Sequence, residues 1–182
     1  MKKKEQLYIL LEGTDDERYF NAVIIPHFKT KYKKVNSIRY ANMPKNIFIK
    51  YIKTFQEQGS DYIMFTDLDS QGDKNYCVTK RKNKIIKNYK SKIKQDQIIV
   101  IKEEIESWYL AGITQADLKI YKIKKQNNTE LVNKEQFKQL IPKDFTSTMD
   151  FMIEILKEYA LDYAVGINNS LKYFSEKFSL KI

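Results

Sequence analysis

The sequence predicts an α/β protein with a four-stranded, mainly parallel sheet flanked by helices, followed by an α-helical C-terminal extension. Strand-length apolar runs alternate with amphipathic helical segments over residues 1–113, and this alternation is typical of a doubly wound sheet. From Thr114 the alternation gives way to helical segments. We therefore expect a first domain at 1–113 and a helical extension at 114–182 that packs on it.

Hydrophobic periodicity and breaker residues place the elements of the first domain. Short runs of β-forming residues mark strands, and apolar residues at helical spacing mark helices. Pro26 is expected to end the first helix, and Gly59 follows the second as a C-cap signal. The expected strands are Tyr8–Leu11, Val35–Tyr40, Tyr62–Thr66 and Gln97–Ile101, and the expected helices between them are Asp16–Ile25, Lys45–Gln58 and one within Lys74–Lys94.

Three helical segments are expected in the extension, with Pro142 and Gly166 as breakers. A basic stretch, Lys119–Lys125, fits either an exposed strand or a loop. The expected helices are Asn133–Leu140, Thr148–Tyr163 and Ser170–Phe178.

Composition and charge limit the location and the partners. The net charge is +10, from 33 Lys and Arg against 23 Asp and Glu, which favours a polyanionic partner such as nucleic acid. The single cysteine excludes an internal disulfide and suits a reducing cytoplasm. No apolar stretch approaches the length of a membrane span, and the basic start precedes an apolar run too short for a signal peptide. We expect a cytoplasmic protein with no membrane partner.

Carboxylates follow three of the expected strands. They are Glu12 after the first, Asp67 and Asp69 after the third, and Glu104 and Glu106 after the fourth. The carboxyl ends of parallel strands share one edge of a sheet, so these acids are expected to meet there. Asp16, four residues after Glu12, reaches the same crevice if the intervening turn is tight.

A dense acidic cluster of this kind requires cations, because like charges otherwise raise the pKa of their neighbours. Oxygen ligands suit Mg²⁺ or Mn²⁺, and two ions would clamp both oxygens of a phosphoryl displacement. The alternative for Asp67 and Asp69 is a solvated, Asp-rich turn. Lys102, beside the fourth group, is expected to stabilise extra negative charge on the phosphate.

The three acidic motifs together resemble a TOPRIM domain, the metal-binding unit of topoisomerases, primases and several nucleases. Glu12-Gly13-Thr14-Asp15-Asp16 resembles the form found in the OLD (overcoming lysogenization defect) nucleases. Glu104-Ile105-Glu106-Ser107-Trp108-Tyr109-Leu110 resembles the E-x-E-x-W-L-L signature of small stand-alone TOPRIM-like proteins, including RloB relatives linked to phage defence. The resemblance covers 8–111 and implies metal ligation by Glu12, Asp67 and Asp69, with Glu106 as a further ligand.

The sequence also departs from these families. Gly72 fits the longer D-x-D context only loosely, and no tyrosine can be assigned as a topoisomerase nucleophile. No G-x-x-x-x-G-K-[S/T] motif occurs, although OLD nucleases usually carry an ATPase. A separate ATPase subunit is therefore a candidate partner.

A basic helical segment follows the D-x-D motif. Its cations are interleaved with apolar residues, which indicates one lysine-covered helix face, and a solvated surface is the alternative reading. The expected nucleic-acid-binding residues are Lys80, Arg81, Lys84 and Lys87.

The leading functional hypothesis is a Mg²⁺-dependent nuclease that acts on DNA or RNA, with Glu12 as ligand and candidate general base. The first alternative is a non-catalytic TOPRIM-like protein that binds nucleic acid or a protein partner. The second is another Mg²⁺-dependent phosphoryl-transfer enzyme. An early helix start near Glu103 would turn Glu104 away and leave Glu106 as the single ligand of the fourth group.

Overall fold

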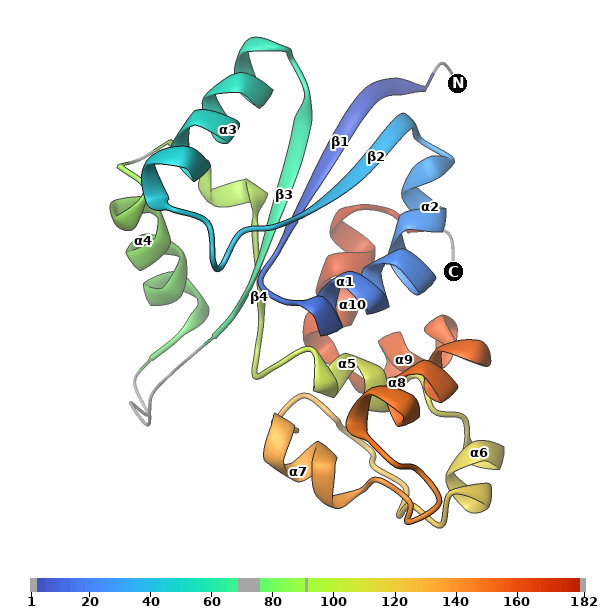
Figure 1. Ribbon diagram of the computed structural model, residues 1–182. Coiled ribbons are helices and arrows are strands. Elements are labelled where there is room, and N and C mark those ends of the chain that lie inside the picture. The colour runs from blue at the N-terminus through green and yellow to red at the C-terminus, as the bar shows by residue number, and fades with distance from the viewer. Residues whose placement is uncertain (1–2, 69–75, 91, 181–182) are drawn as a thin grey trace. The chain divides into compact units, whose positions relative to one another are not determined.

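The computed structural model describes residues 3–68, 76–90 and 92–180 (Figure 1). The chain forms two compact units, Met1–Val100 and Ile101–Ile182. The segment Glu104–Ala111 therefore belongs to the second unit, whereas the sequence pattern placed it in the first domain. Asp69 lies outside the described residues.

A four-stranded sheet in the order β2-β1-β3-β4 forms the centre of the fold, and all strands run parallel. β1 (Lys4–Leu11) pairs with both β2 (Tyr32–Arg39) and β3 (Asp61–Asp67), and β4 (Ile98–Ile101) lies beside β3. The central strands are near-continuous apolar runs because a parallel sheet is covered on both faces. The predicted α/β fold with a four-stranded parallel sheet flanked by helices is confirmed.

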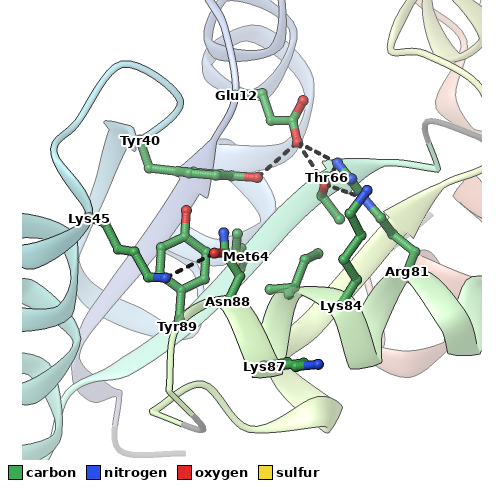
Figure 2. A pocket seen from close by; sticks show the side chains of 11 residues that line it. Glu12, Tyr40, Lys45, Met64, Thr66, Arg81, Lys84, Lys87, Asn88 and Tyr89 are labelled. Atoms are coloured by element: carbon green, nitrogen blue, oxygen red, sulfur yellow. Dashed lines mark hydrogen bonds and ion pairs between the residues drawn. The ribbon is translucent and has the colours of Figure 1, made fainter. Parts of the chain in front are cut away.

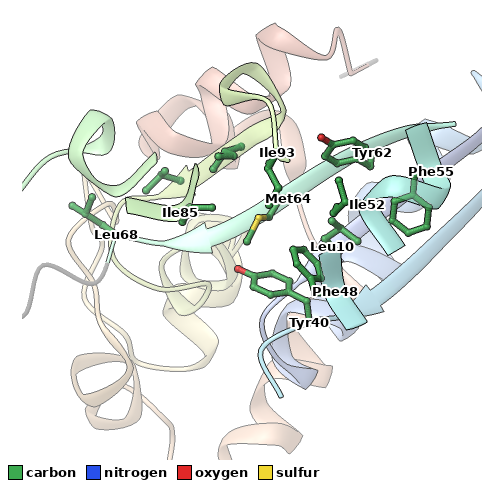
Figure 3. Packing of buried hydrophobic residues seen from close by; sticks show 12 residues of the cluster. Leu10, Tyr40, Phe48, Ile52, Phe55, Tyr62, Met64, Leu68, Ile85 and Ile93 are labelled. Atoms are coloured by element: carbon green, nitrogen blue, oxygen red, sulfur yellow. The ribbon is translucent and has the colours of Figure 1, made fainter. Parts of the chain in front are cut away.

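Alternate residues of the strands supply two cores, since side chains in a strand point to opposite faces. On one face, Leu10, Met64 and Val100 pack in a cluster with α3 (Lys45–Glu57) and α4 (Val78–Asn88) (Figure 3). On the other face, Phe65 meets Phe20 at a ring-centroid distance of 4.4 Å. Figure 1 shows α3 and α4 on one side of the sheet and α1 and α2 on the other.

The first helix departs from the prediction. α1 (Thr14–Tyr19) continues as a π-helical segment, Phe20–Ile24, and then as α2 (Ile25–Lys29). The prediction that Pro26 ends the helix was wrong. Pro26 occupies the second position of α2, directly after the π-helical segment. The wider turn of a π-helical segment departs from regular α-helical bonding, and it is in regular α-helical bonding that proline clashes with the preceding turn.

β2 begins three residues earlier than expected, because residues 32–34 also belong to the strand. This strand lies at the edge of the sheet. Lys33 and Lys34 are exposed there, and charged side chains protect a sheet edge against pairing with another chain.

The second unit is helical, as predicted. Its helices are α5 (Glu106–Ala111), α6 (Gln115–Ile120), α7 (Lys134–Gln139), α8 (Thr148–Lys157), α9 (Leu161–Ile167) and α10 (Asn169–Lys177). Trp108 of α5 packs against α10: its ring stacks on Phe174 at a centroid distance of 5.7 Å, and its Nε1 donates to Ser170 Oγ at 2.8 Å. None of the described helices has the length and apolar character needed to cross a membrane.

The helix expected over Thr148–Tyr163 is divided into α8 and α9. Tyr159 lies in the break, donates its hydroxyl to the carbonyl of Trp108 at 2.8 Å, and packs over Gly112. A Cβ added at Gly112 would lie 2.0 Å from the Tyr159 ring. The segment Lys119–Lys125 starts in the last two residues of α6 and continues as turn and loop. Of the two expected alternatives, a loop or an exposed strand, the loop describes the part after α6.

Candidate functional site

Glu12 lies directly after β1, at the point where the strand order changes direction. From β1 the chain crosses to β2 on one side, and β3 lies on the other. In open α/β sheets such a switch point forms a crevice at the carboxyl ends of the strands, where ligands bind. The structure therefore places Glu12 where this fold presents a ligand site.

Glu12 is held by hydrogen bonds from the neighbouring strands. Its Oε1 accepts from the Tyr40 hydroxyl at 2.9 Å and from Thr66 Oγ1 at 2.6 Å (Figure 2). Tyr40 follows β2 and extends its pairing, since the Tyr40 N–H donates to the Leu11 carbonyl at 2.9 Å. Thr66 is the second-last residue of β3. Three adjacent strand ends thus orient one carboxylate.

Arg81 of α4 joins this network. Its Nη2 donates to Thr66 Oγ1 at 2.8 Å and lies 3.5 Å from Glu12 Oε1. The Thr66 hydroxyl therefore accepts from the guanidinium and donates to the carboxylate. The Arg81 side chain is only 13% exposed, so this contact is better shielded from solvent than an ion pair on the surface.

Tyr40 remains a hydrogen-bond donor at this position. Burial, reinforced by the negative charge of Glu12, raises the pKa of the phenol well above its usual value. The hydroxyl also lies 2.9 Å from the carbonyl of Phe65.

Asp16 is a second, buried carboxylate on the same turn. It is 8% exposed, and its Oδ2 accepts from the Gly13 N–H at 2.9 Å. Burial, with a contribution from Glu12, raises the pKa of Asp16 to about 6. A Cβ at Gly13 would lie 3.3 Å from Asp16 Oδ2, so glycine at this position leaves room for the carboxylate to fold back.

A cleft of about 530 Å³ opens beside Glu12. Its described lining contains one carboxylate, Glu12, and the basic side chains of Lys45, Arg81, Lys84 and Lys87. Lys80, on the same helix, is not among the lining residues. The structure thus brings three of the four predicted nucleic-acid-binding residues to the cleft that contains Glu12, and Arg81 additionally contacts that acid.

The other predicted site residues lie elsewhere in the chain. Asp67 is the last residue of β3, and Asp69 is outside the described residues. In the second unit, Glu106 is the first residue of α5 and is 3% exposed, and Lys102 forms an ion pair with Glu130 at 3.2 Å.

Glu104, also in the second unit, accepts from the backbone N–H of Lys134. α5 begins at Glu106, later than the start expected near Glu103. The role of Glu106 as a ligand and the role of Lys102 in catalysis stay predictions.

Carboxylate oxygens are the donors that Mg²⁺ and Mn²⁺ prefer. A divalent cation would also offset the cost of burying Asp16 near Glu12, so the residues present fit such an ion in kind. Within the described parts of the chain, however, no group of three or more His, Cys, Asp or Glu side chains is arranged to hold a metal. The metal site stays a prediction.

Sequence reasoning missed Tyr40 and Thr66, and it gave Arg81 a different role. Tyr40 ends a predicted strand, and Thr66 directly precedes the D-x-D motif, so position relative to strand ends was the available signal. The contact of Arg81 with Glu12 has no such signal, because it depends on how α4 is rotated against the sheet.

No protein-family model and no curated protein matches this sequence. Among solved structures, the chain is similar to the C-terminal region of the Burkholderia pseudomallei OLD protein, with 14% identity, a TM-score of 0.38, and coverage of 96% of this chain and 89% of that one. It is also similar to the C-terminal region of the Xanthomonas campestris pv. campestris OLD protein, with 14% identity, a TM-score of 0.38, and coverage of 83% and 78%. At this level of similarity, neither likeness identifies the function of this chain.

Proposed function

We propose that this protein is a nuclease that requires Mg²⁺ or Mn²⁺ and hydrolyses phosphodiester bonds in DNA or RNA. One observation carries the proposal: Glu12, a carboxylate at the switch point of the sheet, shares a cleft with four basic side chains. Phosphoryl transfer needs cationic groups that bind the phosphate and acids that hold a metal in the same place.

We assign the cation to Glu12, with Asp16, Asp67 and Asp69 of the same unit as candidate further ligands. Oε1 of Glu12 already accepts hydrogen bonds from Tyr40 and Thr66, so we assign the other oxygen to the cation. When bound, a divalent cation supplies Lewis-acid polarisation of the phosphate and activation of water.

The chain's own residues have separate tasks in this proposal. Lys84 and Lys87 neutralise the phosphodiester, while Tyr40 and Thr66 fix the rotamer of Glu12. With one oxygen hydrogen bonded and the other assigned to the cation, Glu12 acts as a ligand and not as the general base. Arg81 lies beside both the carboxylate and the cleft, so it would orient Glu12 and contact the phosphate.

A cleavage assay tests the proposal. Plasmid, single-stranded DNA and tRNA are incubated with the protein and Mg²⁺ or Mn²⁺, and nucleic-acid binding is measured in parallel. Glu12→Gln should lower turnover by about 100-fold or more, as expected for lost transition-state electrostatics. Affinity should stay equal or rise, because a negative charge disappears from the cleft.

Glu57→Gln is the matched control. Glu57 is an exposed carboxylate of α3 that pairs with Lys53 and does not line the cleft. Its variant should cleave like the wild type. If Glu12→Gln cleaves as fast as Glu57→Gln, the assignment of Glu12 is wrong.

A non-catalytic nucleic-acid-binding protein is the second candidate. The contact between Arg81 and Glu12 favours it, because a guanidinium near the carboxylate competes with a metal for the same charge. If the wild-type protein binds all three substrates but cleaves none, even with a partner ATPase supplied, the nuclease proposal is wrong and the protein is a non-catalytic nucleic-acid binder.

A further inference from the structure

The cleft beside Glu12 differs in chemistry along its length. Glu12, Arg81 and Lys84 line the cleft together with Lys45, Asn88 and Tyr89. Figure 2 shows Arg81 and Lys84 on the side of Glu12, here called the anion-binding end. Tyr89 and Lys45 lie on the opposite side, here called the aromatic end.

The aromatic end offers a surface for a planar ring. Tyr89 is half-buried and is supported by Phe48, whose ring centroid lies 4.6 Å away. Met64 and Ile85 contribute apolar side chains to the same cleft. Apolar and aromatic side chains do not bind a phosphate, whereas any of the nucleobases can stack on an aromatic ring.

A polar pair from the facing helices accompanies this surface. Lys45 at the start of α3 donates from Nζ to Asn88 Oδ1 at 3.0 Å, and both residues line the cleft. The ammonium and the amide carry donors and an acceptor of the kind that contact base edges.

The size of the cleft argues for one nucleotide at a time. Its volume of about 530 Å³ lies within the range of roughly 300–1,000 Å³ that holds a small ligand. A duplex presents only base edges within its grooves. A base therefore enters such a cleft only from an unpaired strand or after it leaves the stack.

We infer that this cleft binds a single unpaired nucleotide, with the base against Tyr89 and the phosphate at Arg81 and Lys84. The ligand class is a nucleoside phosphate, supplied by an unpaired stretch of a nucleic acid or as a free nucleotide. The inference deepens the proposed function and rests on it for the choice of nucleic acid as substrate.

Binding without metal tests the site separately from cleavage. The affinities of a fluorescent oligothymidylate, of the same strand in a duplex, and of thymidine monophosphate as competitor are measured in EDTA. The single strand should bind at least about tenfold more tightly than the duplex. Competition by the monophosphate at oligonucleotide-like affinity would support the site and identify the free nucleotide as its ligand.

Aromatic variants test the stacking surface. Tyr89→Leu should weaken single-strand binding by about five- to 100-fold, the range measured for one base stacked on an aromatic ring, whereas Tyr89→Phe keeps the ring and should bind like the wild type. Tyr51→Leu is the control, since Tyr51 is an exposed tyrosine of α3 outside the cleft. Equal single-strand and duplex binding, with no effect of Tyr89→Leu, would overturn the inference.

Charge variants test the phosphate end and do not depend on whether Tyr89→Leu folds. Lys84→Gln should weaken binding of the strand and of the monophosphate several-fold, and Lys80→Gln should weaken the monophosphate little, because only Lys84 lines the cleft. Equal losses in both variants would contradict a defined phosphate position.

Separate cleavage measurements with Mg²⁺ distinguish the two proposals. If the protein prefers unpaired strands but cleaves no substrate, the nucleotide site is supported and the nuclease proposal is wrong. If it cleaves duplex DNA and Tyr89→Leu changes neither binding nor cleavage, the nuclease proposal is supported and the nucleotide site is wrong.

Discussion

Replacing Asp16 by Asn should stabilise the metal-free protein at neutral pH. Asp16 has a pKa of about 6 in the folded protein, against an ordinary value of 3.8, chiefly because it is buried. A raised folded-state pKa contributes stability that is fully present below pH 3.8 and is lost as the pH rises through about 6. Each pKa unit corresponds to 1.36 kcal/mol, so charging Asp16 costs up to about 3 kcal/mol at pH 7.

The substitution removes this cost and keeps the local hydrogen bond, since the Asn side-chain oxygen can still accept from the Gly13 N–H. Urea unfolding in EDTA should therefore show Asp16→Asn more stable than the wild type at pH 7, by up to about 3 kcal/mol. At pH 4 the two proteins should be nearly equal, because most of Asp16 is then protonated in the folded wild type. The exposed carboxylate of Glu57, changed to Gln, should give no such pH-dependent gain.

The same pair of proteins reports on the metal. Mn²⁺ should raise the melting temperature of the wild type more than that of Asp16→Asn, because a ligand that binds only the folded state stabilises it. An equal gain in stability at pH 4 and pH 7 would refute the electrostatic reasoning. Equal responses to Mn²⁺ would remove Asp16 from the ligand set.

Three further substitutions test features of the two units. Thr66→Val removes the hydroxyl that accepts from Arg81 and donates to Glu12. It should slow cleavage about tenfold or more and leave the affinity for nucleic acid unchanged. An unchanged turnover would show that this hydroxyl is not needed to orient Glu12. Gly112→Ala should lower the stability in urea by about 1–3 kcal/mol through overpacking against Tyr159, and an unshifted midpoint would contradict that packing. Asn168→Ala should lower the free energy of unfolding in urea by about 2 kcal/mol or more, because the buried Asn168 side chain donates to Thr129 and accepts from Ser170. A smaller loss would show that these two hydrogen bonds contribute less than expected.

The sheet and the place of its ligand crevice were predictable because they follow from local signals. Buried apolar runs marked β1 and β3, and a parallel arrangement then put Glu12 after β1 and Asp67 at the end of β3 on the same edge of the sheet. The helical second unit followed from periodicity in the same way. These features depend on residue type and spacing alone.

Other features depend on packing between distant segments and gave no local signal. Pro26 predicts a helix end, but the helix continues through the π-helical segment into α2, with proline at the second position of α2. The break between α8 and α9 depends on Tyr159 finding Gly112. The division of the chain before Ile101 likewise reflects which helices α5 packs against, including α7, α8 and α9.

The hydrogen bonds to Glu12 have a consequence for the folding of the chain. Their donors lie 28 residues away at Tyr40 and 54 at Thr66, and Arg81 is 69 residues distant. Contacts of such separation form only after long loops have closed, and parallel strand pairing is slow for the same reason. The carboxylate is therefore oriented only after β1, β2, β3 and α4 have all assembled. A partly folded chain would carry the acids and the lysines without the arrangement that joins them.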